Sequence, residues 1–162
     1  MTQIAVYAGS FDPITRGHEN LIQRALHFVD RLVVAVAINS AKQPLFSVAE
    51  RKAFIRDAVP DPRVEVGEFS GLLVDYARKV GATLSIRGLR AVADFEYEYQ
   101  MALMNHHLHP GLETVFMVPG TDLTYVSSSI VREVARYGGN TADLVHPAVE
   151  RALRAKFAKS KS

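Results

Sequence analysis

Apolar runs alternate along the chain with longer stretches in which apolar and polar residues recur at helical spacing. The run from Leu32 to Ile38 is continuous and rich in β-branched residues, which is typical of a strand buried on both faces of a sheet. The same pattern predicts strands over residues 4–7, 32–38, 64–66, 83–86 and 114–118. It predicts helices over residues 17–29, 48–58, 72–80, 92–108 and 130–137, and a last helix that begins at Pro147.

Local signals place several of the helix ends. Ser47 and Glu50 have the spacing of a capping box, in which two side chains satisfy free backbone groups at the start of a helix. Gly81 follows the third predicted helix at a position that favours left-handed backbone, and Pro147 suits a first helical position. The alternation of strands and helices indicates an α/β fold, with a parallel five-stranded sheet and helices on both faces. Because ligands of such sheets bind outside the carboxyl ends of the strands, chemistry is expected directly after the first, second, fourth and fifth strands.

Length and composition fit one ordinary domain. Of the 162 residues, 48% are hydrophobic and 22% are charged, so residues 1–162 are predicted to form a single domain with a frayed tail from about 158 to 162. Cysteine is absent, which excludes disulfides, thiolate metal sites and a cysteine nucleophile. No apolar run approaches the ~20 residues of a membrane span, and no basic segment precedes an apolar one at the N-terminus. A soluble, cytoplasmic protein without a membrane partner is therefore expected.

The overall charge argues against a nucleic-acid partner. The 19 Lys and Arg exceed the 17 Asp and Glu by only two, although the sequence pI is about 9.0. Nucleic-acid binding depends on clustered basic residues that neutralise many phosphates, and only the tail from Lys156 to Lys161 approaches such a cluster. What matters is where the basic residues lie, and four of them follow predicted strands. These are His18, Lys42, Arg87 and Arg90.

The loop after the first strand has features of an anion site. Gly9 permits close backbone approach, Ser10 offers a hydroxyl, and His18 falls at the start of a helix, where free N–H groups attract an anion. A helix N-terminus disfavours the imidazolium form of His18, whereas a bound polyphosphate favours it. The spacing matches neither of the common glycine-rich phosphate loops. A turn with a capping histidine is the alternative.

Candidate anion-binding side chains also follow the second, fourth and fifth strands. Lys42 lies on a loop, where a solvated surface lysine is the ordinary explanation. Arg87 and Arg90 flank a glycine at a strand end, and arginine forks bind phosphate through two hydrogen bonds, although an ordinary salt-bridged pair is the alternative. The hydroxyls of residues 127–129 stand before a helix, where one N-cap would suffice. Together these loops indicate transfer between phosphates, in which positioning and charge neutralisation dominate.

The histidines near the end of the long helix raise the question of a metal site. His106 and His107 point about 100° apart on a helix, and no cysteine completes a ligand set with them or with His109. A solvated helix end, where these side chains complement the helix dipole, is the favoured interpretation.

Three segments resemble one enzyme family. Residues 9–18, GSFDPITRGH, resemble the G-[ST]-F-D-P-x-T-x-G-H signature of bacterial phosphopantetheine adenylyltransferases. Residues 86–98, IRGLRAVADFEYE, match that family's most specific segment, and residues 126–132, VSSSIVR, resemble the hydroxyl-rich nucleotidyltransferase motif. The similarity extends from about Ile4 to Phe157. The signature in residues 9–18 alone would indicate only the wider nucleotidyltransferase superfamily.

The resemblance implies a reaction and its setting. ATP and 4′-phosphopantetheine would give dephospho-coenzyme A and pyrophosphate, the penultimate step of coenzyme A biosynthesis. A Rossmann-like fold, a Mg²⁺ requirement, a homohexamer and feedback inhibition by coenzyme A are implied as well. The resemblance leaves the metal ligands unknown, since Mg²⁺ is often held mainly by substrate phosphates and water.

The resemblance also assigns residues to the two substrates. His18 would stabilise the transition state, with Lys42 and Arg90 as further catalytic residues. The family's phosphopantetheine-contacting positions are occupied here by Ser10, Lys42, Leu73 and Arg87. Its ATP-contacting positions are occupied by Ser10, Phe11, His18, Gly88, Leu89, Arg90, Glu98, Leu123, Thr124, Tyr125, Val126, Ser127, Ser128 and Ser129.

Two other functions stay open on the sequence alone. Adenylyl or cytidylyl transfer to another phosphorylated acceptor, such as nicotinamide mononucleotide, would use the same loops, because acceptor choice depends on pocket shape. Leu73 and its apolar neighbours in residues 72–76 could line a groove for the pantetheine arm or belong to the core. A non-catalytic nucleotide sensor or RNA-binding module is the alternative from a different class.

Overall fold

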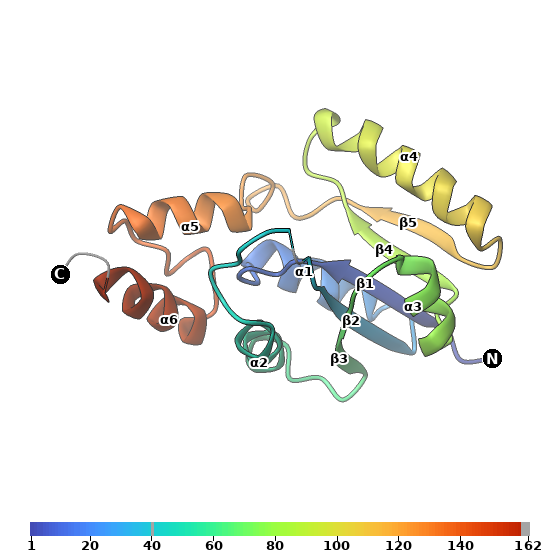
Figure 1. Cartoon of the computed structure of the whole chain (residues 1–162), viewed down its shortest axis with the longest axis horizontal. Coiled ribbons are helices and arrows are strands. Elements are labelled where there is room, and N and C mark those ends of the chain that lie inside the picture. Colours follow the sequence, from blue (N-terminus) through green and yellow to red (C-terminus); the bar gives the residue numbers. More distant parts are fainter. Residues whose placement is uncertain (40, 160–162) are drawn as a thin grey trace.

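A parallel five-stranded sheet forms the centre of the molecule (Figure 1). The structure is a computed structural model that describes residues 1–39 and 41–159, with the side chain of residue 93 left out. The strand order is β3-β2-β1-β4-β5, and every neighbouring pair is parallel. The strands are β1 (Ile4–Gly9), β2 (Arg31–Ala37), β3 (Val64–Phe69), β4 (Leu84–Gly88) and β5 (Glu113–Met117). The predicted α/β, Rossmann-like architecture is thus confirmed.

Helices connect the strands and extend the chain beyond the sheet. They are α1 (Arg16–Ala25), α2 (Val48–Ala58), α3 (Leu73–Val80), α4 (Val92–Leu108), α5 (Ser128–Arg136) and α6 (Pro147–Ala158). The capping box at Ser47 and Glu50 is present, Gly81 ends α3 with φ of 71°, and Pro147 is the first residue of α6. These local predictions are confirmed, because each depends on backbone groups that only nearby residues satisfy.

Several element boundaries differ from those predicted, and three of the differences have a clear reason. Helix α1 ends at Ala25 instead of residue 29, although Leu26 and Val29 continue the apolar pattern and are buried. Strand β3 extends to Phe69, beyond Gly67 and Glu68, which interrupt the apolar pattern; as an edge strand it exposes Glu65 and Glu68. Strand β4 includes Arg87 and Gly88, which pair with β5. The arginine and the glycine interrupt the apolar pattern, so the pattern alone ends the strand too early.

The core lies on both faces of the sheet. In β1, Ala5 and Tyr7 belong to the larger cluster, which packs against α1, α2, α5 and α6. Val6 and Ala8 point to the other face and belong to a smaller cluster with residues of α3. This alternation along one strand explains why the central strands are apolar without interruption.

The strand order opens a crevice at one edge. From β1 the chain runs to β2 and β3 on one side, and later to β4 and β5 on the other. The connections therefore diverge between the carboxyl ends of β1 and β4, where parallel sheets bind their ligands. Figure 1 shows α5 and α6 packed together beyond this end of the sheet, with α4 lying along β5.

The C-terminal helix closes the described part of the chain. Ala158 ends α6 and Lys159 is its C-cap, while residues 160–162 of the expected frayed tail lie outside the described residues. Among the helices described, none is both long and apolar enough to cross a membrane.

Candidate active site

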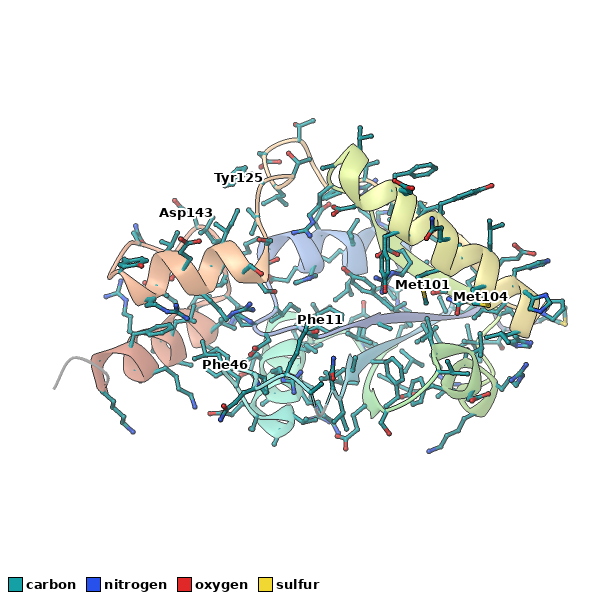
Figure 2. All side chains as sticks on the ribbon, turned by 45° about the horizontal axis from the view of Figure 1, so that its top comes forward. Phe11, Phe46, Met101, Met104, Tyr125 and Asp143 are labelled. Carbon is teal, nitrogen blue, oxygen red and sulfur yellow. The ribbon has the colours of Figure 1, made fainter. Side chains whose placement is uncertain are left out.

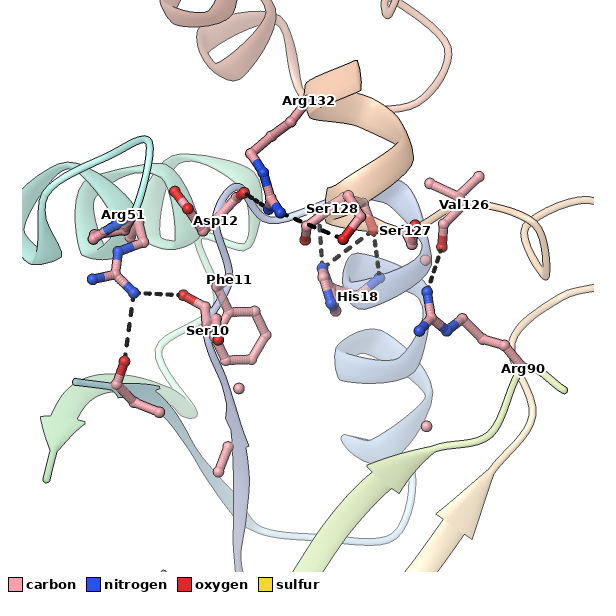
Figure 3. Close-up of a pocket in the computed structure, with 18 of the residues that line it drawn as sticks. Ser10, Phe11, Asp12, His18, Arg51, Arg90, Val126, Ser127, Ser128 and Arg132 are labelled. Atoms are coloured by element: carbon pink, nitrogen blue, oxygen red, sulfur yellow. Dashed lines mark hydrogen bonds between the residues drawn. The ribbon is translucent and has the colours of Figure 1, made fainter. Parts of the chain in front are cut away.

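A cavity of about 660 Å³ opens at the carboxyl edge of the sheet, within the size range of small-molecule sites. It is lined by the ends of β1 and β4, the start of α1, the segment after β2, and the loop that enters α5 (Figure 3). This is the edge where the strand alternation predicts chemistry. The predicted residues that line it are Ser10, Phe11, His18, Lys42, Arg87, Gly88, Arg90, Glu98, Leu123, Val126, Ser127, Ser128 and Ser129.

Four predicted site residues lie outside the lining of this cavity. Leu73 is partly buried against the smaller core cluster under α3. The N–H of Leu89 donates to the carbonyl of Met117, and the Thr124 hydroxyl donates to the carbonyl of Thr121. Tyr125 is exposed on the loop before α5, where Figure 2 shows it standing away from the sheet.

The loop between β1 and α1 places His18 at the cavity. Thr15 caps α1, and its N–H donates to Nδ1 of His18 at 3.0 Å, while the N–H of His18 donates to the Thr15 hydroxyl at 3.4 Å. The two residues form a capping box in which histidine replaces the usual Glu or Gln. Because Nδ1 accepts a hydrogen bond, the proton of the neutral ring is on Nε2.

The surroundings of His18 keep its ring neutral. Burial, together with the nearby charge of Arg90, lowers the pKa of His18 to about 4. The ring of Phe11 packs edge-on against it, with centroids 5.0 Å apart. His18 therefore does not add positive charge at neutral pH, which corrects its inclusion among the basic residues of this edge. The alternative of a capping histidine is correct as well, and it leaves Nε2–H available to a ligand.

Arg87 is held by a carboxylate. Its Nε and Nη2 donate to the two carboxylate oxygens of Glu98 at 2.8 and 2.6 Å, and its Nη1 donates to the carbonyl of Ala8 at 2.8 Å. Such a two-bond pair fixes the plane of the guanidinium and neutralises most of its charge. The salt-bridged alternative therefore describes Arg87, while Arg90 lies 3.7 Å from Asp94 and is more exposed.

The three serines before and within α5 have different partners. The hydroxyl of Ser127 accepts from the N–H of Ile130, so it is the N-cap. The hydroxyl of Ser128 donates to the carbonyl of Pro13 and ties α5 to the loop after β1, whereas Ser129 accepts from Arg132. Helix capping thus accounts for the Ser127 hydroxyl, and the bond to the loop after β1 accounts for the Ser128 hydroxyl. The uncapped N–H groups of the first turn of α5 remain at the cavity, where they favour an anion.

Several lining residues carry no assignment from the sequence. Asp12 accepts the N–H groups of Leu45 and Phe46, each at 2.9 Å, and its own carbonyl accepts from Arg132 at 2.7 Å. Arg51, on α2, also lines the cavity and is buried. Asp12 and Arg132 stand in the two motifs at residues 9–18 and 126–132, which was the available signal for them.

The charge at the cavity is locally positive. Six cations and three carboxylates line it, an excess of three, although the whole chain carries only +2. The cations are Lys42, Arg51, Arg87, Arg90, Arg132 and Arg136, and the carboxylates are Asp12, Asp94 and Glu98. The expected concentration of positive charge at this edge is present, and it involves more arginines than the sequence indicated.

The histidines at the end of α4 lie away from this cavity. His106 and His107 are exposed, and Nδ1 of His106 lies 3.8 Å from Glu113. Within the described residues, no group of three or more His, Cys, Asp or Glu is placed to hold a metal ion.

Comparison with known proteins gives concordant matches. Residues 6–134 match the model of the family described as cytidylyltransferase-like. The chain is 56% identical over 160 residues to the phosphopantetheine adenylyltransferase of Anaeromyxobacter dehalogenans (strain 2CP-C), covering 98% of each chain. It is 50% identical over 154 residues to the protein of that name from Thiobacillus denitrificans (strain ATCC 25259 / T1), covering 94% of this chain and 96% of the relative.

Solved structures show the same fold at low sequence identity. A putative nicotinate-nucleotide adenylyltransferase from Vibrio parahaemolyticus superposes with a TM-score of 0.72 at 16% identity, covering 96% of this chain and 93% of its own. The nicotinic acid mononucleotide adenylyltransferase of Plasmodium falciparum superposes with a TM-score of 0.68 at 14% identity, covering 99% and 96%.

Proposed function

The chain belongs to the phosphopantetheine adenylyltransferases, enzymes of the cytidylyltransferase-like family that transfer the adenylyl group of ATP to 4′-phosphopantetheine, and we propose that this transfer takes place in the cavity between β1 and β4. The products are dephospho-coenzyme A and pyrophosphate, in the penultimate step of coenzyme A biosynthesis. The observation that carries the assignment of the site is the convergence of His18, Arg87, Arg90 and the start of α5 on one positively charged cavity.

The acceptor phosphate is proposed to bind between β1, β2 and β4. Ser10 offers a hydroxyl at the end of β1, and Lys42 is exposed on the segment after β2. Arg87 lies at the end of β4, with its guanidinium plane fixed by Glu98. A phosphate between these three side chains would meet a hydroxyl, an ammonium and the remaining N–H groups of an oriented guanidinium. The pantetheine arm would then extend toward Leu73.

The ATP is proposed to bind between α1, the end of β4 and α5. Its phosphates would meet His18, Arg90 and the first turn of α5, where free N–H groups and the helix dipole favour anions. The remaining proposed contacts lie on the same loops. They are Ser10, Phe11, Gly88, Leu89, Glu98, Leu123, Thr124, Tyr125, Val126, Ser127, Ser128 and Ser129.

The chemistry needs positioning more than proton transfer. An oxygen of the acceptor phosphate attacks the α-phosphorus of ATP, and the bond from that phosphorus to the bridging oxygen breaks, so pyrophosphate leaves with the electron pair. The acceptor phosphate is already anionic near neutral pH, and no strong general base is required. Nε2–H of His18 is proposed to donate to an α-phosphate oxygen as charge develops there, with Lys42 and Arg90 neutralising the phosphates on either side.

A Mg²⁺ ion is proposed to enter with the ATP. Of the carboxylates at the cavity, Asp12 and Glu98 have their oxygens engaged by N–H groups, so the described residues fit an ion held mainly by phosphate oxygens and water. When bound, the ion would neutralise part of the charge on the transferring phosphates.

The assembly is proposed to be a homohexamer that uses the open face of α4. That helix packs on β5 and α3, yet it exposes many large apolar side chains, and such a patch marks an interaction surface. These residues are Val92, Phe95, Tyr97, Tyr99, Met101, Leu103, Met104 and Leu108, of which Met101 and Met104 are labelled in Figure 2. Light scattering should give six times 17.9 kDa, and a monomer would contradict the proposal.

The proposed function also includes inhibition by the end product of the pathway and a location in the cytoplasm. Coenzyme A carries the pantetheine and adenylate groups of both substrates, so we propose that it inhibits by occupying the same cavity, in the cytoplasm where its synthesis proceeds. Inhibition that ATP and 4′-phosphopantetheine fail to relieve would contradict a shared site.

The decisive experiment is a pyrophosphate-release assay with ATP, Mg²⁺ and a panel of phosphorylated acceptors. Release with 4′-phosphopantetheine and none with nicotinamide mononucleotide is expected. Preference for nicotinamide mononucleotide would favour the alternative acceptor, and release with no acceptor of the panel would favour a non-catalytic nucleotide-binding module.

A further inference from the structure

Arg51 of α2 is a buried cation without a carboxylate partner among the described residues. It is 4% exposed, and its hydrogen bonds go to three main-chain carbonyls. Nη1 donates to Ser10 at 2.8 Å and to Ala37 at 3.5 Å, and Nε donates to Ser47 at 3.4 Å. Figure 3 shows the guanidinium beside the loop after β1, with hydrogen bonds to Ser10 and to the end of β2.

Burying the Arg51 guanidinium in this way carries a free-energy cost. Burying a charge without an opposite charge is unfavourable, and carbonyl dipoles compensate only in part. Arg87, in the same cavity, has its charge neutralised by Glu98. The charge of Arg51 is compensated only by carbonyl dipoles, so it contributes attraction for an anion in a region of low dielectric.

The three carbonyls belong to segments that meet at the proposed acceptor-phosphate site. Ser10 is itself a proposed ligand of that phosphate. Ala37 is the last residue of β2, directly before the segment that carries Lys42, and Ser47 caps α2 after that segment. One side chain therefore sets the separation between the loop after β1 and the segment after β2.

Asp12 holds the other end of the same segment. Its carboxylate accepts the N–H groups of Leu45 and Phe46, whereas Arg51 holds the carbonyl of Ala37. We name residues 38–46 the lysine segment. Ala37 directly before it, through Arg51, and Leu45 and Phe46 at its end, through Asp12, are thus tied to residues 10–12. Within this segment, residue 40 is not described.

We infer that Arg51 is a positioning residue for the acceptor phosphate, because it fixes Ser10 and the lysine segment relative to each other and places beside them a charge that no carboxylate of the described residues neutralises. The inference rests on the proposed function, in which Ser10 and Lys42 bind 4′-phosphopantetheine. ATP is proposed to share Ser10 with the acceptor, but its phosphates are proposed to bind on the opposite side, at His18, Arg90 and α5. Arg51 should therefore act mainly on the acceptor, because the lysine segment is proposed to contact only that substrate.

Two variants and a matched control test this inference. Arg51→Ala removes the charge and the fork, Arg51→Lys keeps the charge but cannot reach three carbonyls, and Arg56→Ala removes an exposed arginine from the same helix. The KM for 4′-phosphopantetheine should rise between about tenfold and 100-fold in Arg51→Ala and less in Arg51→Lys, because small misplacements are costly. The KM for ATP should change less than about twofold, and Arg56→Ala should match the unaltered protein in both.

Chemical rescue separates positioning from folding. Guanidinium at low millimolar concentration should lower the acceptor KM of Arg51→Ala and leave that of Arg56→Ala unchanged. A rise of both KM values together, or of neither, with a fall in unfolding temperature would assign Arg51 a purely structural role and overturn the inference. If Arg51→Ala does not fold, the KM ratio of Arg51→Lys decides. Failure of the proposed function would be recognised separately, because the unaltered protein would then release no pyrophosphate with 4′-phosphopantetheine.

Discussion

Helices α1 and α2 begin with the same local device and differ in what it serves. In α2, the Ser47 hydroxyl accepts from the Glu50 N–H, and the Glu50 carboxylate accepts from the Ser47 N–H. In α1, Thr15 and His18 make the equivalent pair of bonds. The Glu50 carboxylate offers only acceptors and also lies 3.8 Å from the Lys156 ammonium, whereas the His18 imidazole accepts the cap bond with one nitrogen and keeps an N–H on the other. The residue type at the third helical position therefore decides whether a cap can also serve a ligand.

Replacing His18 should have the largest effect. His18→Ala removes both the cap bond and Nε2–H, and His18→Gln keeps a side-chain acceptor for the cap while misplacing the donor. Loss of one donor to developing negative charge costs on the order of 100-fold to 1,000-fold in kcat. We expect that loss in His18→Ala, with both KM values changed only a few-fold, and a smaller loss in His18→Gln. Steady-state kinetics measures it, and a large rise in KM at unchanged kcat would refute the role in the transition state.

Arg87 differs from His18 because an ion pair with Glu98, and not a helix cap, holds its side chain. Arg87→Ala should weaken 4′-phosphopantetheine binding about tenfold or more and leave ATP binding nearly intact, because only the acceptor phosphate is proposed to contact the guanidinium. Calorimetry with each substrate separately measures both affinities.

Glu98, the partner that Arg87→Ala leaves behind, needs its own control. Arg87→Ala leaves the Glu98 carboxylate unpaired near a phosphate, and this alone could weaken binding. The double variant Arg87→Ala with Glu98→Gln removes that charge. Acceptor affinity restored to the original value in the double variant would show that Arg87 only neutralises Glu98.

The pKa of His18 predicts a stability difference between acid and neutral pH. Because burial lowers this pKa from an ordinary value of 6.5 to about 4, the unfolded chain binds the proton more readily. The stabilisation is fully present above pH 6.5 and is lost as the pH falls toward 4. At pH 5, His18 should cost about 2 kcal/mol of unfolding free energy relative to pH 7.5. Urea unfolding of the unaltered protein and of His18→Gln at both pH values measures this, and equal losses in the two would exclude His18 as the source.

Local physics explains which parts of this molecule were predictable. The caps at Ser47, Gly81 and Pro147 depend on neighbouring residues, and the buried strands depend on continuous apolar runs, so both are visible in the sequence. The convergence of loops after parallel strands follows from topology. The end of β4 was missed because Arg87 is polar, and its place in the sheet depends on pairing with β5, which is distant in sequence.

The site was less predictable than the fold, because it depends on contacts between residues that are distant in sequence. The motifs place His18, Arg87 and the serines at one edge of the sheet. Whether each side chain is charged, paired or free to bind a ligand depends on the residues that it contacts in the fold. The sequence does not reveal that Arg87 meets Glu98 or that burial keeps His18 neutral. Arg51 carries no local signal at all, because its role comes from carbonyls on three separate segments.

The smallest effect is expected from breaking the cap of α2. Glu50→Ala removes the bond to the Ser47 N–H, and losing one such group should cost about 1 kcal/mol of unfolding free energy. The carboxylate of Glu50 is not part of the cavity lining, so kcat and both KM values should stay unchanged. The comparison with His18→Ala is then direct, since the two variants lose the same structural bond and only one loses a group at the cavity. If Glu50→Ala lost activity as His18→Ala does, the activity loss of both would come from frayed helix starts, and the Nε2–H of His18 would need no role in the transition state.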